Sequence, residues 1–506
     1  MPVIPRATRP PNLLVVMVDQ LRASALELHR HPIRDASLTL ARTPHLASLA
    51  ACGVRYEWAF TPNPICVPAR VSFWTGRWGH LTGARTNAIY MPDAETHLLH
   101  LLADAGYTCG LLGKNHCFTP SQIERFFGTY YPAGHLGPHD PGGDAEVAAA
   151  KEFCRAMGGP GGPAYAAEVS PFPVQKHGTW LVGNEADRFI RANRDHPWCA
   201  WVSIADPHTP YQVSEPYASL YPPDALALPP HEPAGFPGKP ERVRLFAELM
   251  GAVGVSDDHL RFVLSIYYGM ITVIDEVVGR LLATLDELGL RQDTIIVFTA
   301  DHGDYMTEHR LVRKGASMYD PLVHVPLLVS YPARVRAGQT SDALVSVLDV
   351  FPTLTELLRL PLPPGRSGRP LPGATAAGDE AAPRGAIFSE YGSEEPPPTR
   401  EAVRARQEQL HEARGQGEST AAGLPWGIAN RGKMKMIRTR EWKYTYQPGG
   451  GDELSHLTED PHELVNLSNE PEHRERVADF RRRLLDWTVE TEDTLPGRER
   501  VADQGH

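Results

Sequence analysis

Short apolar runs alternate with longer amphipathic segments over the first two-thirds of the chain. Four runs rich in branched or aromatic residues predict buried strands: Leu13–Val18, Tyr107–Leu112, Trp198–Ile204 and Thr294–Thr299. Apolar residues at helical spacing predict helices at 44–51, Glu95–Ala105 and Leu260–Leu288. Strands that alternate with helices favour an α/β domain, with a mostly parallel sheet flanked by helices.

The last quarter of the chain has a different pattern. A Gly/Pro-rich stretch at 360–385 indicates a connection between domains. We place the boundary at residue 375, between a larger α/β domain, 1–375, and a smaller C-terminal α+β subdomain, 376–506.

Two short segments of this subdomain, Ile387–Tyr391 and Met434–Tyr446, predict an antiparallel sheet, because the second breaks at Arg440-Glu441 as a hairpin does. A helix at Glu472–Glu490 is expected against this sheet. The polar segment Gly392–Gly423 has few large apolar residues and predicts a mobile insertion, with a charged helix at Glu401–Arg414.

Composition narrows the class of protein. The 506 residues carry a net charge of −11, which is unlike the basic surface of a nucleic-acid-binding protein. No apolar run approaches the roughly 20 residues that cross a bilayer. Leu13–Val18 is too short for the core of a signal peptide. We therefore expect a cytoplasmic protein with no membrane contact. The chain has six cysteines. The five other than Cys66 are expected to be free buried thiols, because no CxxC pair occurs.

Cys66 lies at the start of a short predicted helix. Pro68 suits the first turn, where its missing N–H would have no partner, and Thr75-Gly76 ends the helix. The N-terminus of a helix offers unpaired N–H groups and the positive end of the helix dipole. With Arg70 one turn further along, the segment predicts an anion site around Cys66.

Ionisable residues follow four predicted strands at the carboxyl end, where sites form in parallel α/β sheets. They are Asp19-Gln20, Lys114 with His116, His208, and Asp301-His302. Two carboxylates at strand ends would repel each other unless a cation lies between them, so a divalent metal is expected. Any one of these aspartates alone would more often be a cap or turn residue.

These residues occur in an order that resembles the type I, formylglycine-dependent sulfatases of the alkaline phosphatase superfamily. The matching motifs are Asp19, Cys66-Val67-Pro68-Ala69-Arg70 with Thr75-Gly76-Arg77, Gly113-Lys114-Asn115-His116, Asp206-Pro207-His208, Thr299-Ala300-Asp301-His302-Gly303-Asp304 and Lys314. Two C-terminal segments also match the family, namely Glu441-Trp442-Lys443-Tyr444 and Glu459–Leu467. The resemblance implies an alkaline-phosphatase-like fold.

The resemblance also implies a mechanism. Cys66 would be oxidised to formylglycine by a maturation enzyme, and the hydrate of its aldehyde would attack the sulfur of a small sulfate ester. One divalent metal ion would be held by five residues: Asp19, Gln20, Cys66, Asp301 and His302.

The remaining roles follow position by position from the same resemblance. Asp301 would take a proton from the nucleophile, and Arg70 and His116 would orient the hydrate. Lys114 and Lys314 would bind the ester oxygens, with Arg313 as a competitor for the second role. His208 would be the acid that protonates the leaving group, a task that can change a rate by roughly 10²–10⁴-fold.

Two positions depart from the commonest sulfatase pattern, which has Asp and Asn where this chain has Gln20 and His302. The pair resembles choline-sulfatase-like members and phosphonate monoester hydrolases. An imidazole ligand makes Mn²⁺ an alternative to Ca²⁺. Lys114 and His116 favour sulfate esters, because the phosphorus-specific relatives have hydroxyl residues there. A phosphonate monoester or phosphodiester hydrolase remains the alternative function.

Some assignments stay open at this stage. Asn87 either faces the substrate or is an ordinary turn residue. Trp74, Trp78 and Tyr90 either line a pocket for an aryl, sugar or other small organic group or belong to the core. The oligomeric state is also open, with a homo-oligomer among the alternatives. A relative whose Cys66 is never oxidised would bind anions without catalysis.

Overall fold

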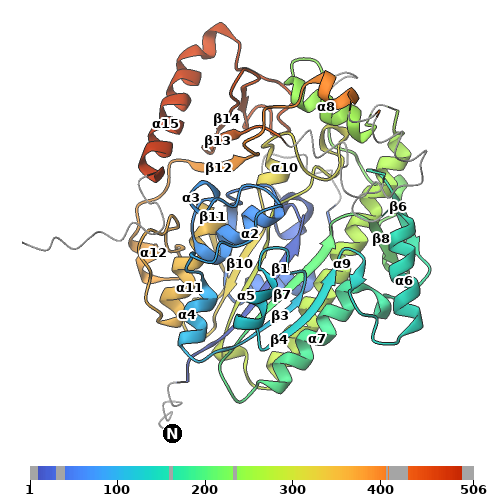
Figure 1. The fold of residues 1–506 in the computed structure, drawn as a ribbon, viewed down its shortest axis with the longest axis vertical. Helices are drawn as coiled ribbons and strands as arrows, with labels where there is room; N and C mark the ends of the chain where they lie inside the picture. Colours follow the sequence, from blue (N-terminus) through green and yellow to red (C-terminus); the bar gives the residue numbers. More distant parts are fainter. Residues whose placement is uncertain are drawn as a thin grey trace, which may run out of the picture.

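The computed structural model describes residues 9–29, 40–158, 163–231, 236–252, 254–405, 408 and 431–492. Within them, a nine-stranded sheet forms the centre of the larger domain, and a four-stranded sheet with one long helix packs at one end of it (Figure 1). This arrangement confirms the predicted α/β fold with a C-terminal antiparallel subdomain. The boundary at residue 375 stays a prediction.

The large sheet has the strand order β11-β2-β10-β9-β1-β7-β3-β4-β5. Their bounds are β1 Asn12–Asp19, β2 Val54–Phe60, β3 Thr108–Gly113, β4 Thr129–Gly134, β5 Gly137–Pro138, β7 Trp198–Pro207, β9 Thr294–Ala300, β10 Leu327–Ser330 and β11 Gln339–Ser346. β1 pairs in parallel with β7 and β9 and is buried along its whole length. A strand buried on both faces reads as a continuous apolar run, which is why Leu13–Val18 could be recognised.

Helices cover both faces of this sheet. On β7, Trp201 packs against Trp74 of α2 (Cys66–Thr75), whereas Trp198 packs against Phe189 of α7 (Gly178–Ala192). Positions three apart in a strand point to opposite faces, so α2 and α7 lie on opposite sides of the sheet. The other helices of eight residues or more before the C-terminal subdomain are α1 Pro44–Ala51, α6 Ala145–Ala156, α8 Glu241–Met250, α9 Asp257–Glu287 and α11 Val350–Leu358.

Shorter elements complete the larger domain. The short helices are α3 Gly79–Thr82, α4 Leu98–Asp104, α5 Pro120–Phe126 and α10 Asp320–Val323, and β6 Ala167–Ser170 pairs with β8 Tyr211–Ser214. A further short helix, α12 Ala376–Glu380, directly follows the predicted boundary. α4 begins three residues later than predicted, because His97 is its cap residue.

The long helix α9 tests the expectation about membrane contact. By length and composition alone, α9 could cross a membrane, since its most apolar window has a mean hydropathy of 1.5. The expectation that no apolar run approaches that length is wrong for α9 on this measure. However, 78% of the window is buried inside the fold, where α9 packs against α1 and α7. These contacts fit the core helix of the larger domain.

The C-terminal subdomain contains the predicted hairpin. Strands β12 Ile387–Tyr391, β13 Met434–Arg438, β14 Trp442–Tyr446 and β15 Glu453–His456 form an antiparallel sheet in that order. Helix α15, Arg474–Glu492, packs on it through Val477, Phe480, Leu484 and Trp487. Residues 400–405 are helical, and most of the rest of the predicted charged helix at 401–414 lies outside the described residues.

Buried charges join this subdomain to the larger domain. Asp320, at the start of α10, accepts hydrogen bonds from Arg438 Nη2 at 2.9 Å and Lys443 Nζ at 2.8 Å. Lys443 Nζ also lies 2.7 Å from Glu463 Oε1, and Glu463 Oε2 accepts from the Asp320 N–H at 2.7 Å. The C-terminal motif Glu459–Leu467 therefore takes part in the contact between the subdomain and α10 of the larger domain. α10 follows the loop that carries Lys314.

Candidate active site

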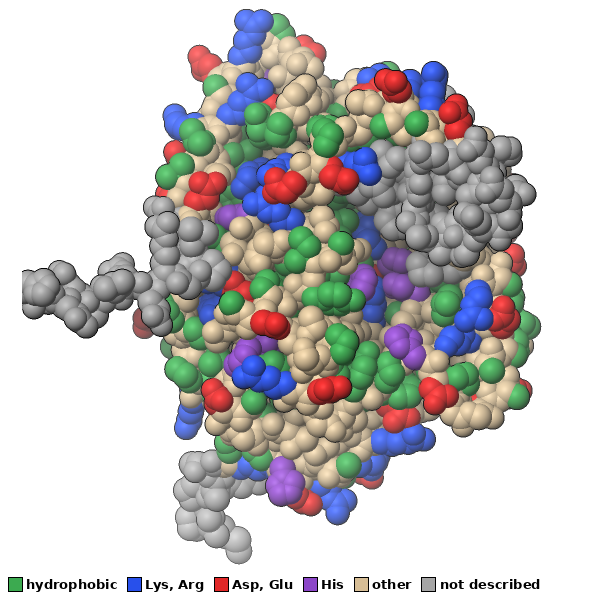
Figure 2. Space-filling view, viewed as in Figure 1, with side chains coloured by type: hydrophobic (Ala, Val, Ile, Leu, Met, Phe, Trp, Pro, Cys, Tyr) green, Lys and Arg blue, Asp and Glu red, His purple; other side chains and the backbone are tan. Residues whose placement is uncertain are grey.

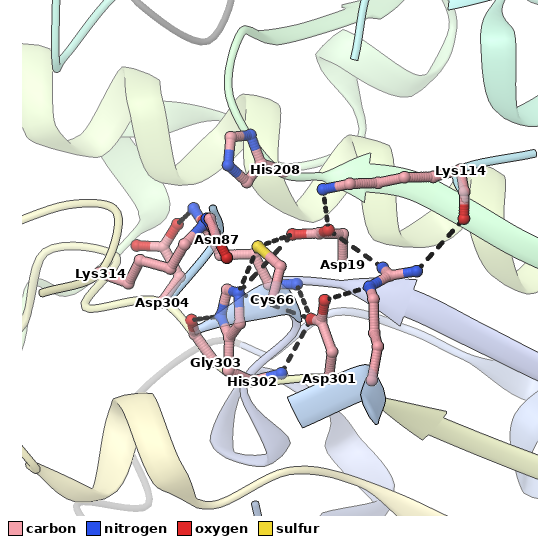
Figure 3. A network of polar contacts seen from close by, with 12 residues as sticks. Asp19, Cys66, Asn87, Lys114, His208, Asp301, His302, Gly303, Asp304 and Lys314 are labelled. Atoms are coloured by element: carbon pink, nitrogen blue, oxygen red, sulfur yellow. Dashed lines mark hydrogen bonds and ion pairs between the residues drawn. The ribbon is translucent and has the colours of Figure 1, made fainter. Parts of the chain in front are cut away.

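Four of the predicted metal ligands meet at the carboxyl edge of the large sheet. One donor atom from each of Asp19, Cys66, Asp301 and His302 lies within 4.8 Å of every other, and all four side chains are buried (Figure 3). Cys66 Sγ lies 3.1 Å from His302 Nε2 and 3.7 Å from Asp19 Oδ1. The grouping of two strand-end carboxylates with an imidazole and the start of a helix was predicted from the sequence.

The local fold explains this convergence. β1 and β9 are parallel neighbours, so Asp19 and Asp301 leave the sheet side by side. Asp301 Oδ1 accepts hydrogen bonds from the backbone N–H groups of Gln20 at 3.1 Å and His302 at 2.8 Å, which fix the carboxylate. Cys66 is the first residue of α2, and the start of this helix lies at the same edge of the sheet.

Arg70 bridges the two carboxylates. Its Nε donates to Asp301 Oδ2 at 2.8 Å and its Nη2 to Asp19 Oδ2 at 3.1 Å. Its Nη1 donates to Ser203 Oγ at 2.7 Å, and the guanidinium is fully buried. The sequence indicated that Arg70 lies one turn from Cys66, but it did not reveal the carboxylate partners or Ser203.

The electrostatics of the two carboxylates differ. Burial alone would raise the pKa of Asp19, but Lys114, His208 and Arg70 hold it well below its usual range. Burial and the nearby Asp19 raise the pKa of Asp301. Asp19 is thus the stronger anion, and Asp301 is the carboxylate that more readily accepts a proton.

Lys114 contacts His135, a residue that the sequence did not indicate as part of the site. Lys114 Nζ forms an ion pair with Asp19 Oδ2 and lies 2.9 Å from His135 Nε2. The His135 ring stacks on the His208 ring, with centroids 3.8 Å apart. His135 belongs to a Gly/Pro-rich stretch, Ala133–Asp144, which carries no motif and gave no signal of a site.

Lys314 and Gln20 form a second branch of the network. Lys314 Nζ donates to Gln20 Oε1 at 2.7 Å, and Gln20 Nε2 donates to Asp304 Oδ2 at 2.5 Å. The amide oxygen of Gln20 is therefore engaged by a lysine, and its role as a metal ligand stays a prediction. Arg313, the alternative to Lys314, donates instead to the carbonyl of Pro163 at 3.0 Å.

A pocket of about 260 Å³ opens onto Cys66. Its lining consists of Gln20, Cys66, Asn87, His116, His135, His208, Thr209, Met250, Arg313 and Lys314. Histidine and basic side chains also gather in a hollow on the face shown in Figure 2. Asn87 lines the pocket, and its Oδ1 accepts from the Val67 N–H at 3.0 Å, so its contact with a substrate stays a prediction. Trp74 and Trp78 pack in hydrophobic clusters, and Tyr90 is exposed.

Asp206 has a structural role in the Asp206-Pro207-His208 motif. Its carboxylate accepts a hydrogen bond from Thr179 Oγ1 and lies 3.3 Å from His177 Nδ1, so it anchors the end of β7 to the start of α7. His208 Nδ1 lies 2.7 Å from the carbonyl oxygen of Thr209. Because a carbonyl only accepts, Nδ1 carries the proton in this contact and Nε2 is the ring atom left for chemistry.

Known proteins are similar to this chain in sequence and in fold. A family model described as Sulfatase matches residues 11–360. An ulvan-active sulfatase of Formosa agariphila is 29% identical over 478 residues, covering 91% of this chain and 78% of the relative. A choline-sulfatase of Rhizobium meliloti is 26% identical over 488 residues, covering 92% and 83%. The crystal structure of a phosphonate monoester hydrolase of Agrobacterium radiobacter has a TM-score of 0.71 at 23% identity, covering 95% and 96% of the two chains.

The chain has the fold of that crystal structure, with a buried cluster of possible metal ligands at the carboxyl edge of its large sheet. The family model covers more than half of the chain, so the chain belongs to the sulfatase family, and it is a sulfuric ester hydrolase.

Proposed function

We propose that the chain hydrolyses the sulfate monoester of a small organic molecule, with a formylglycine made from Cys66 as nucleophile and one divalent metal ion as cofactor. The observation that carries the proposal is the position of Cys66, whose Sγ lies within 4.8 Å of a donor atom of each of Asp19, Asp301 and His302 (Figure 3). Conversion of the thiol to an aldehyde removes sulfur and two electrons from the Cys66 side chain. It therefore needs an external oxidant and a maturation enzyme.

The donor set fits a metal ion. Asp19, Asp301 and His302 would hold it with the modified Cys66, and Gln20 would join them by turning its amide oxygen away from Lys314. Carboxylate oxygens suit Ca²⁺ and Mn²⁺, and the imidazole makes Mn²⁺ the better match. When bound, the ion would make the hydrate a stronger nucleophile at neutral pH.

The residues around the pocket supply the remaining steps. Asp301 would accept a proton from the hydrate as its oxygen attacks sulfur, and His208 Nε2 would protonate the ester oxygen as the bond from sulfur to that oxygen breaks. His208 Nε2, then neutral, would accept the proton of the second hydroxyl as the carbon–oxygen bond to sulfate breaks and the aldehyde is restored.

Charge explains why an anion would bind here. Two cations, Arg70 and Lys114, already offset Asp19 and Asp301, so Lys314 and a divalent ion leave the site positive. Burial, His135 and Lys314 hold the pKa of His208 well below its usual range. A bound anion opposes these effects, so His208 gains its proton in the substrate complex, where it is needed.

Size supports a small substrate. A pocket of about 260 Å³ is below the roughly 300–1,000 Å³ of pockets for drug-sized ligands. An aryl sulfate, a choline-like ester or a single sugar sulfate fits this class. A phosphonate monoester or phosphodiester is the alternative substrate, because the pair Gln20 and His302 resembles that of phosphonate monoester hydrolases. We also propose that the protein acts in the cytoplasm.

Relative rates separate the two substrates. We expect kcat/KM for an aryl sulfate to exceed that for a matched aryl phosphodiester and a phenylphosphonate ester, because Lys114 and His116 occupy positions at which the phosphorus-specific relatives have hydroxyl residues. The measurement uses the matured protein and one leaving group throughout. Phosphorus substrates faster by orders of magnitude would overturn the choice of sulfate.

Metal binding tests the cluster. Asp19→Asn should weaken Mn²⁺ binding by at least about 100-fold, because it removes a charged ligand from a buried site. Calorimetry with the metal alone measures this without turnover. Asp275→Asn is the matched control: Asp275 is also buried, but it accepts hydrogen bonds from the start of α1. Equal affinity in the two variants would exclude Asp19 as a ligand.

A further inference from the structure

His135 occupies a position between two cavities. It is the one described residue that lines both the pocket at Cys66 and a second, smaller cavity of about 30 Å³ behind it. Polar side chains from other elements also line this second cavity, among them Asp206, Gln212 and Ser214. His135 thus forms part of the wall of the substrate pocket and has a polar environment on its far side.

The contacts of His135 fix its protonation. Lys114 Nζ is only a donor, so His135 Nε2 at 2.9 Å must be the acceptor and the ring proton lies on Nδ1. Nδ1 is buried without a partner among the described residues. A water molecule in the second cavity would supply one, since a space of about 10–15 Å³ is enough to hold a water.

The ammonium of Lys114 has three N–H donors. One is directed to Asp19 and one to His135, so the third remains for an oxygen of the anion. Without the contact to His135, Asp19 alone would orient the ammonium. The stacked rings of His135 and His208 similarly restrict the plane of the His208 ring, whose Nδ1 is held by the carbonyl of Thr209.

We propose that His135 is a positioning residue for the proposed hydrolysis: its Nε2 aims the Lys114 ammonium at the anion, and its ring face holds His208 at the leaving group. The two functions use different parts of one side chain. They can therefore be separated by substitution.

Two variants separate these functions. His135→Phe keeps a ring against His208 but has no acceptor for Lys114, whereas His135→Gln keeps an acceptor but has no ring. Loss of a hydrogen bond to a charged group weakens binding by roughly 10–100-fold. His135→Phe should therefore raise KM at least about 10-fold for every sulfate ester. His135→Gln should lower kcat at least about 10-fold for an alkyl sulfate, whose leaving group needs an acid, and less than about 3-fold for a nitrophenyl sulfate, whose leaving group does not.

Controls distinguish positioning from stability. His100→Phe changes another histidine that contacts a histidine ring, that of His97, away from the pocket, and should leave the ratio of alkyl to aryl rates unchanged. Thermal midpoints are measured for all variants. Losses of kcat in His135→Gln that are equal for both esters and follow the thermal midpoint would overturn the proposal, as would wild-type kinetics in both variants.

Binding of inorganic sulfate keeps the test independent of turnover. His135→Phe should weaken sulfate binding by at least about 10-fold, as measured by calorimetry, through the loss of the Lys114 contact. If the wild-type protein turned over no sulfate ester, the proposed function would be wrong. This measurement would still test whether His135 positions the Lys114 ammonium. Unchanged sulfate affinity in His135→Phe would refute that role.

Discussion

Cys66→Ala will abolish turnover and leave the fold intact. Without a nucleophile precursor, kcat for any sulfate ester should fall by at least about 10⁴-fold, as when a covalent catalyst is removed. The free energy of unfolding should change by less than about 1 kcal/mol, well below the 2–5 kcal/mol of a core deletion, because the thiol contacts Asp19 and His302 rather than a hydrophobic cluster. Steady-state kinetics and denaturant unfolding measure the two effects.

Cys117→Ala is the matched control. Cys117 is also fully buried, lies among hydrophobic residues, and has its pKa raised to about 12 by burial. Its loss should leave kcat unchanged. Peptide mass spectrometry of the wild-type protein, made in a host able to mature formylglycine, should find an aldehyde at Cys66. Thiol alone at that position would refute the proposed nucleophile.

Asp320→Ala will have the largest effect on stability. It leaves the buried guanidinium of Arg438 without its carboxylate and takes one of two carboxylates from Lys443. Breaking a buried ion pair by removal of one partner costs about 3–5 kcal/mol, because a charge then remains in the interior. Chemical denaturation should show a loss of this size.

The exposed pair Arg482–Asp479 provides the comparison, since Arg482 is 69% exposed. Arg482→Ala should change the free energy of unfolding by less than about 1 kcal/mol. Similar losses in the two variants would mean that the buried network does not hold the C-terminal subdomain against the larger domain.

The fold could be read from the sequence where burial is continuous. Strands β1, β7 and β9 are buried along nearly their whole length, and such runs have few alternative interpretations. β11 was missed because its first half alternates between exposed and partly buried positions, and β10 because it has only four residues. The start of α9 was placed three residues late, because the cap at Ser256, whose side chain accepts from the His259 N–H, lies before the apolar pattern begins.

The site residues that could be predicted from the sequence are those that stand in recognisable motifs. Cys66, Asp301 and His302 stand in motifs, and parallel strands bring their ends together. His135 could not be predicted, because its importance comes from Lys114 and His208, which are distant in sequence. The bridge made by Arg70 was hidden for the same reason, since both carboxylates lie on other elements.

The order of these residues along the chain has a consequence for the timing of synthesis. His302, which contacts Cys66, follows it by 236 residues. At a synthesis rate of about 5–20 residues per second, that distance corresponds to about 10–50 s. During this interval Cys66 has left the ribosome without the later half of its surroundings, whereas in the folded chain it is 1% exposed. A maturation enzyme that must reach the side chain therefore has a period of seconds, set by the length of the intervening chain, and slower synthesis between the two positions would lengthen it.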